Sequence, residues 1–363
     1  MFIKNNSNQR RNMYLNFINY FRGFAILLIV MGHLFEITKV FDYNNPQLNS
    51  LFTKIFFPLV TGGTALFVFI SGFLFHYVFY TRGFNLKEFL KNKVKNVLCP
   101  YLFSITPVIV YHLFSNQKNL NFYENKIKFF KILLLNFYSG ALLLSTWYIP
   151  FAFLLFLASP VFIKFIKIKK YHKRIIIGLL LAASIVHRPL HNLTINVFQA
   201  LIYFAPIYCL GIYISMNRES FFENFKGQKK FFAAITLIIL AVQISTGYFM
   251  NSHKSMLEFK HFDLMIFQKF FLCLFLVLFF NEIDKYFGNK LNFLFEILAK
   301  YSFPIFFIHN YLIQFLYPTI GLSRGAGYIE LIFLTIITLT LSVAFSYTIK
   351  AFFKSKSRML IGG

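Results

Sequence analysis

The chain has 363 residues, of which 58% are hydrophobic and 13% are charged, and its mean hydropathy is +0.61. Its apolar residues fall into runs of about twenty, the length that crosses the hydrocarbon core of a bilayer, which excludes an ordinary soluble globular protein. The net charge of +25 resides in short loops between these runs, so it favours orientation in a membrane over nucleic-acid binding. We predict an all-α integral membrane protein in which residues 1–363 form a single polytopic domain with no appended soluble domain.

The apolar runs and the charges of the loops together predict ten transmembrane helices. The N-terminal tail carries Lys4, Arg10 and Arg11, and we expect it in the cytoplasm because short cytoplasmic loops are rich in Lys and Arg. The succession of basic loops then places both termini in the cytoplasm, and we expect the membrane to be the cell (inner) membrane. The predicted spans cover residues 15–36, 56–80, 97–115, 147–163, 175–191, 194–215, 231–250, 262–281, 298–317 and 328–350.

The apolar run 129–144 is interpreted differently, because it is short and contains Asn136, Ser139 and Gly140. Counting it as a full span would place the strongly basic loop 164–174 outside the cytoplasm, against the positive-inside rule. We therefore predict that this run is re-entrant or interfacial.

The first predicted span carries two ionisable residues, Arg22 and His33. They are eleven positions apart, very nearly three helical turns, so both project from one face with about 16 Å between them along the axis. An ionisable residue inside a membrane helix is a functional hypothesis by default. Arg22 could instead be an interfacial anchor, and His33 could make a structural hydrogen bond to another helix. Glu36, about one turn further on, could orient the imidazole of His33 and raise its basicity, or be a solvated helix end.

Polar residues of the later spans receive more conservative interpretations. His187, Arg188 and His191 cluster at the outer end of the fifth span, where we expect them to lie in water, with a role in lining an acceptor cleft as the alternative. Trp147, the only tryptophan, is explained by anchoring at the membrane interface.

His309 and Asn310 lie inside a span, so we expect them to face the bundle, with hydrogen bonding between helices as their default role. No metal site is predicted, because the cysteines lie within or beside apolar runs and show no metal-ligand spacing. They are Cys99, Cys209 and Cys273.

Five segments, in order along the chain, resemble the membrane-bound acyltransferase-3 family. They are Tyr20–His33, Gly62–Phe73, Lys91–Tyr101, Thr146–Pro160 and Leu298–His309. The basic loop departs from the family pattern, in which two arginines usually lie three residues apart, because Lys93 and Asn96 stand at the corresponding positions. Lysine and asparagine bind phosphate less well than a bidentate arginine, so Lys91, Lys93 and Lys95 are expected to share this role.

The resemblance implies transfer of an acyl group, commonly acetyl from acetyl-CoA, to a hydroxyl of a cell-surface carbohydrate such as an O-antigen or exopolysaccharide sugar. The CoA phosphates would meet Arg22 and the basic loop from the cytoplasm, and the pantetheine arm would extend toward His33. His33 would then act as general base on the acceptor hydroxyl or as a nucleophile. Glu36 would assist it.

Two other classes of function stay open at this point. A transporter or flippase of a glycan or lipid-linked intermediate would use Arg22 and His33 to line a polar path. A lipid-linked glycan polymerase would be expected to carry a large extracytoplasmic catalytic loop, which the sequence does not contain.

Overall fold

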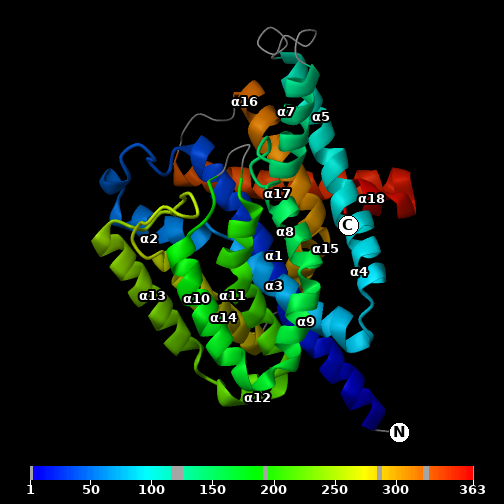
Figure 1. Cartoon of the computed structure of the whole chain (residues 1–363), viewed down its shortest axis with the longest axis vertical. Helices are drawn as coiled ribbons and strands as arrows, with labels where there is room; N and C mark the ends of the chain where they lie inside the picture. The colour runs from blue at the N-terminus through cyan, green and yellow to red at the C-terminus, as the bar shows by residue number, and fades with distance from the viewer. Residues whose placement is uncertain (1–2, 116–125, 191–194, 284–287, 322–326, 363) are drawn as a thin grey trace.

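The computed structural model describes residues 3–115, 126–190, 195–283, 288–321 and 327–362, with the side chains of 3–15, 36, 113–115, 126–129 and 289–290 left aside. These residues form a bundle of helices, and they contain no strand beyond an isolated bridge between Arg188 and His253. The predicted all-α class is confirmed (Figure 1).

The helices follow the apolar runs closely. The first half of the chain forms α1 (Ile3–Thr38), α2 (Leu51–Val60), α3 (Thr64–Leu74), α4 (Leu86–Lys93), α5 (Cys99–Ser115), α7 (Lys126–Ser139), α8 (Tyr148–Leu157) and α9 (Ser159–Lys167). The second half forms α10 (His172–Val186), α11 (Val197–Met216), α12 (Arg218–Asn224), α13 (Lys229–Thr246), α14 (Leu264–Ile283), α15 (Asn289–Tyr311), α16 (Tyr317–Thr319), α17 (Tyr328–Phe353) and α18 (Ser357–Ile361).

Among the described residues, eight helical segments are long and apolar enough to cross a membrane, and α8 with α9, bent by 54°, makes a ninth. Helix α10 lies where another span was predicted, but its 15 residues reach only about 22 Å, less than the roughly 30 Å of hydrocarbon. The count is thus close to the ten spans predicted, and the protein is a multi-pass membrane protein.

The run predicted not to cross the membrane forms α7, whose 14 residues reach only about 21 Å. Helix α7 packs against α5, and the Tyr101 hydroxyl donates a hydrogen bond of 2.5 Å to the carbonyl of Phe137. Figure 1 shows the two helices side by side at one end of the molecule. The length of α7 agrees with a re-entrant or interfacial segment.

Helices α3 and α11 cross with their backbones in contact. A Cβ placed at Gly72 would lie 2.1 Å from the carbonyl oxygen of Tyr208, and one placed at Gly211 would lie 2.1 Å from that of Phe69. Small residues allow such approach between membrane helices, where packing replaces the hydrophobic effect as the main attraction. The Ser71-Gly72-Phe73 sequence is therefore a packing element of the fold.

The long segment Leu51–Arg82 is broken in its middle, between α2 and α3. Gly62 adopts φ +76° at the break, a left-handed conformation that glycine tolerates best. Lys269 of α14, which is 1% exposed, donates from Nζ to the carbonyls of Pro58 and Leu59 at 2.6 and 3.2 Å. A side chain from another helix thus satisfies the carbonyls at the end of α2, as unpaired backbone groups inside a membrane protein require.

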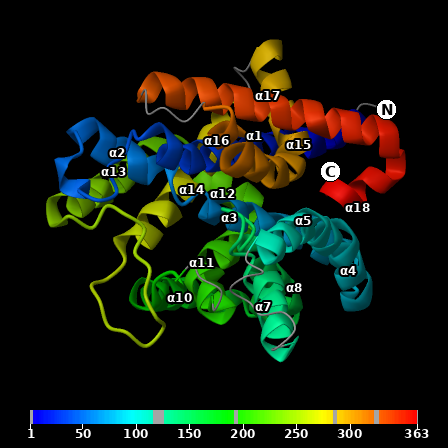
Figure 2. The ribbon, with the colours of Figure 1, turned by 90° about the horizontal axis from the view of Figure 1, so that it is seen from above.

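Helix α1 runs through the centre of the bundle. It packs against α3, α14, α15 and α17, and Figure 2 shows α17 lying along one side of the molecule next to α1 and α15. The short C-terminal helix α18 folds back on α5 and on η4 (Val94–Leu98). The C-terminal tail and the basic loop around Lys93 therefore lie at the same end of the bundle.

Candidate active site

A cavity of about 330 Å³, here called the His33 cavity, opens where α1, the α2–α3 break and α15 meet. His33 of α1 is half-buried in its wall. The other polar lining residues come from the break, from the segment before α8, and from the segments that follow α10 and α13. They are Thr61, Thr64, Ser145, Arg188, Asn251 and His253, with Tyr43, Trp147 and Tyr148 adding aromatic groups.

The imidazole of His33 faces that of His309 on α15, with 5.5 Å between the ring centroids. His309 is fully buried, and its Nδ1 donates to the carbonyl of Ile305 at 2.8 Å, because a carbonyl can only accept. Its Nε2 is then the acceptor nitrogen, and it has no hydrogen-bond partner among the described residues. The two imidazoles are therefore neighbours that make no hydrogen bond to each other in this structure. The prediction that His309 faces the bundle is confirmed, but sequence reasoning did not pair it with His33.

Asn310, the next residue, fixes the segment that leads into α8. Its side-chain amide donates to Ser145 Oγ at 2.8 Å, and its Oδ1 accepts from the backbone N–H of Ser145 at 3.1 Å. This pairing places Ser145, Trp147 and Tyr148 against the cavity. Trp147 is only 6% exposed and its ring stacks with that of Phe204, so the prediction of an interfacial anchor was wrong.

A second cavity of about 340 Å³, here called the Arg22 cavity, is mostly apolar but contains Arg22, Lys93 and Asn96. The ammonium of Lys93 lies 4.7, 5.2 and 4.5 Å from the ring centroids of Phe79, Phe89 and Phe156. The two positions that correspond to the family's paired arginines, 93 and 96, thus both reach this cavity. Gly362 of the C-terminal tail also lines it.

The two cavities adjoin. Phe67 of α3, Tyr148 of α8 and Phe306 of α15 line both of them. Arg22 and His33, on one face of α1 as predicted, therefore open into neighbouring cavities, with three aromatic rings between them.

The other predicted site residues are placed differently. Lys91 and Lys95 are exposed and line neither cavity. Position 36 lies in α1, but the side chain of Glu36 is outside the described residues, so its role stays a prediction.

The cluster expected in water is instead buried. His187 is 0% exposed and Arg188 is 4% exposed, and Arg188 lines the His33 cavity, so the expectation of solvation was wrong. His191 lies outside the described residues. These residues are buried because the segment between α13 and α14 covers this end of α10. No local sequence pattern predicts that contact. The available signal was a charged residue between two histidines at the end of an apolar run.

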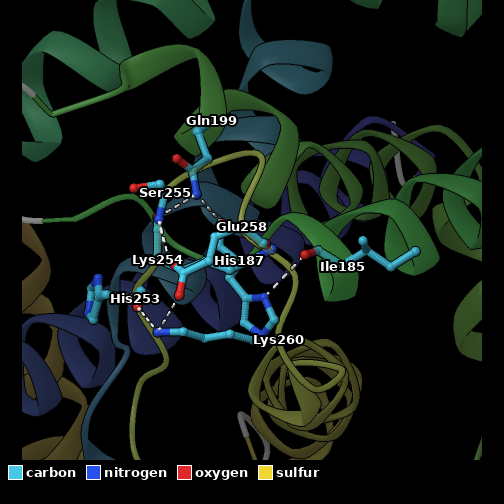
Figure 3. A network of polar contacts seen from close by, with 8 residues as sticks. All are labelled: Ile185, His187, Gln199, His253, Lys254, Ser255, Glu258 and Lys260. Carbon is cyan, nitrogen blue, oxygen red and sulfur yellow. Dashed lines mark hydrogen bonds and ion pairs between the residues drawn. The ribbon is translucent and has the colours of Figure 1, made fainter.

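Hydrogen bonds hold that covering segment in place (Figure 3). The amide of Gln199 donates to the carbonyls of Val186 and Lys254 at 3.0 and 3.1 Å, joining the end of α10 to the covering segment. His253 Nδ1 donates to the carbonyl of Pro189 at 2.7 Å. Burial and the positive charge of Arg188 lower the pKa of His253 to about 4, so this imidazole is neutral at neutral pH.

The comparisons with known proteins identify the family. A family model for an acyltransferase domain, Acyl_transf_3, matches residues 15–349, and the chain belongs to the acyltransferase-3 family. No curated protein and no solved structure matched the chain. The protein is thus a membrane acyltransferase, which disfavours the transporter and polymerase alternatives.

Proposed function

We propose that the protein transfers an acetyl group from acetyl-CoA to a hydroxyl of a cell-surface carbohydrate, such as an O-antigen or exopolysaccharide sugar. One observation supports this most directly: a cavity with two cations adjoins a cavity lined by His33, whose ring lies 5.5 Å from that of His309. Donor and acceptor would enter from opposite ends and meet near Phe67, Tyr148 and Phe306.

The Arg22 cavity suits a CoA thioester. Arg22 and Lys93 supply positive charge for the phosphates, while the apolar lining matches a pantetheine arm. The roughly 16 Å along α1 from Arg22 to His33 is a distance that an extended pantetheine arm could largely cover. Lys91 and Lys95, exposed beside this cavity, would add attraction for the donor without contacting it closely.

The reaction balances with His33 as general base. His33 takes the proton of the acceptor hydroxyl, whose oxygen attacks the thioester carbonyl carbon; the new C–O bond forms and the C–S bond breaks. CoA leaves as thiolate and receives the proton from the imidazolium. In the alternative route His33 itself attacks and an acyl-imidazole transfers the group to the hydroxyl. In both routes the neighbouring ring of His309 would limit the movement of the His33 ring, and Glu36 would raise the basicity of His33.

Replacement of His33 tests the proposal. His33→Ala should lower acetyl transfer per amount of folded protein by at least about 100-fold, since a general base contributes about 10²–10⁴ in rate. The matched control is His172→Ala, which removes a buried histidine that lines neither cavity and whose one hydrogen bond among the described residues joins it to the carbonyl of Phe165. The control should change stability but not specific activity. If His33→Ala kept more than about a tenth of the activity, the catalytic role would be wrong.

Two further measurements address the chemistry and the acceptor. An acetylated protein formed from acetyl-CoA before acceptor is added, and absent in His33→Ala, would identify the nucleophilic route. Mass spectrometry of surface glycans from cells with and without the protein should show acetyl groups that depend on it. A transporter would move glycan without releasing CoA, so CoA release that requires acceptor separates the two classes.

A further inference from the structure

Arg188 is a buried cation with unused hydrogen-bonding groups. Its side chain is 4% exposed, and its Nε and Nη2 atoms have no hydrogen-bond partner among the described residues. Its guanidinium lies 5.5 and 5.4 Å from the ring centroids of Tyr203 and Phe204 on α11, which fix its orientation. Burying unpaired donors of a permanent charge is costly, so such groups point to a missing partner.

At least one of the unused donors, Nη2, lies at the wall of the cavity. Arg188 lines the His33 cavity, and a Cβ built at Gly62, in the wall of that cavity, would lie 3.1 Å from Nη2. The Oδ1 atom of Asn251, another lining residue, is also buried without a partner and would lie 3.5 Å from the same Cβ. The absence of a side chain at Gly62 thus lets one cationic donor and one amide acceptor approach the α2–α3 break closely, and both residues line the cavity of about 330 Å³.

The part of the His33 cavity beside Arg188 carries a positive charge. Arg188 is the only residue with a permanent charge among the described residues lining the cavity, and no described lining residue is acidic. The Cε of Lys269 would lie 2.9 Å from the same Cβ, and its Nζ already donates to the carbonyls of Pro58 and Leu59. Asp263 is a buried carboxylate that interacts electrostatically with Arg188, and its Oδ2 already accepts from the Tyr203 hydroxyl at 2.7 Å. Among the described residues, no carboxylate forms an ion pair with Arg188.

We propose that the acceptor carries an anionic group, a carboxylate or a phosphate, and that Arg188 binds this group at the α2–α3 break while an acceptor hydroxyl reaches His33. This inference rests on the proposed function and specifies its acceptor as an acidic sugar. Asn251 would accept a hydroxyl proton of the same sugar. The planar guanidinium can bind either oxyanion through two parallel hydrogen bonds.

The test measures binding, which does not depend on turnover. The full-length protein in lipid nanodiscs is titrated with methyl glucuronide, methyl glucoside 6-phosphate and neutral methyl glucoside. Both acidic probes, or the one with matching geometry, should bind about tenfold or more tightly than the neutral one, as expected for a charge-assisted hydrogen bond. Whichever acidic probe binds more tightly identifies the anion as carboxylate or phosphate.

Variants assign the preference to Arg188. Arg188→Gln should remove the preference while leaving acetyl-CoA binding unchanged, and Arg188→Lys should keep part of it. Arg174→Gln, at an exposed position in the first turn of α10, the helix that Arg188 follows, should behave as wild type. The inference is overturned if wild type does not bind an acidic probe more tightly than the neutral one, or if Arg188→Gln keeps the preference.

The two proposals can fail separately. If wild type prefers acidic probes but releases no CoA with any acceptor, the proposed function is wrong and the anion site stands. If transfer occurs equally to acidic and neutral sugars and Arg188→Gln lowers both alike, the function stands and Arg188 acts elsewhere, in the chemistry or the fold.

Discussion

Lys93 combines a cationic head with an aromatic enclosure. Three phenylalanine rings surround its ammonium, and it shares a cavity with Arg22, a like charge. Cation–π contacts stabilise the ammonium, but a second cation in the same mostly apolar space does not. Under the proposed function, the donor phosphates would be the anion that binds between them.

We expect donor affinity to distinguish Lys93 from its neighbour Lys91. Lys93→Met keeps the apolar stem and removes the charge, and it should weaken acetyl-CoA binding about tenfold or more, the value of a charge-assisted hydrogen bond. Lys91→Met, at an exposed position outside the cavity, should change affinity by less than about twofold because surface charges are screened. Calorimetric titration of purified protein measures both.

Variants of Arg22 test the same donor site through acetyl-CoA affinity. Arg22→Ala should weaken acetyl-CoA binding more than it lowers the melting temperature, and Arg22→Lys should recover part of the loss. Unchanged affinity in the alanine variant would make Arg22 an interfacial anchor only. Equal losses of acetyl-CoA affinity in Lys91→Met and Lys93→Met would argue against a donor site in the Arg22 cavity, which only Lys93 of the two lines.

At the scale of elements, one helix break and one close crossing of helices shape the candidate site. The α2–α3 break places Thr61 to Thr64 in the wall of the His33 cavity, and Lys269 satisfies the carbonyls that the break exposes. The close crossing of α3 and α11 then holds α3 in place. Any change that separates α3 from α11 should therefore disturb the break and the cavity together.

Gly72 should be far less tolerant of substitution than Gly178. Gly72→Ala puts a methyl group into the backbone of Tyr208, and such overpacking costs about 1–3 kcal/mol. Gly178 of α10 has nothing within 4 Å of a built Cβ, so Gly178→Ala should leave stability unchanged or raise it by up to about 1 kcal/mol. Melting temperatures in detergent compare the two. A similar response of both variants would contradict the observed crossing.

At the scale of the whole molecule, the C-terminal tail reaches the Arg22 cavity. Gly362 of the tail lines the Arg22 cavity together with Lys93 of the basic loop. The tail and this loop must therefore lie on the same side of the membrane. The charges of the loops predict that this side is the cytoplasm.

Reporter fusions test that orientation. Reporters placed after Lys170 and after Lys356 should both report the cytoplasm, and one placed after Asn45 should report the outside. An outside signal at Lys170 would mean that α7 crosses the membrane, although its 14 residues reach only about 21 Å. Opposite signals at Lys170 and Lys356 would rule out the predicted arrangement.

The sequence by itself determined the membrane class, the positions of most helices and the common face of Arg22 and His33. These follow from local regularities, because helix length and period depend on the chain alone. It also identified Lys93 and Asn96, since both lie in a recognisable segment. The prediction for α7 came from its length and its polar interruptions.

Only the tertiary structure decided what surrounds those residues. His309 lies 276 positions after His33, and Arg188 becomes buried only because the segment around His253 folds over the end of α10. Lys93 and Lys91 have the same charge and similar neighbours in sequence, yet only Lys93 points into a cavity. Burial and pairing depend on which helices pack together, and side-chain contacts between distant helices leave no periodic pattern in the chain. The sequence thus identified several residues of the candidate site one by one, but their contact partners are known only from the folded bundle.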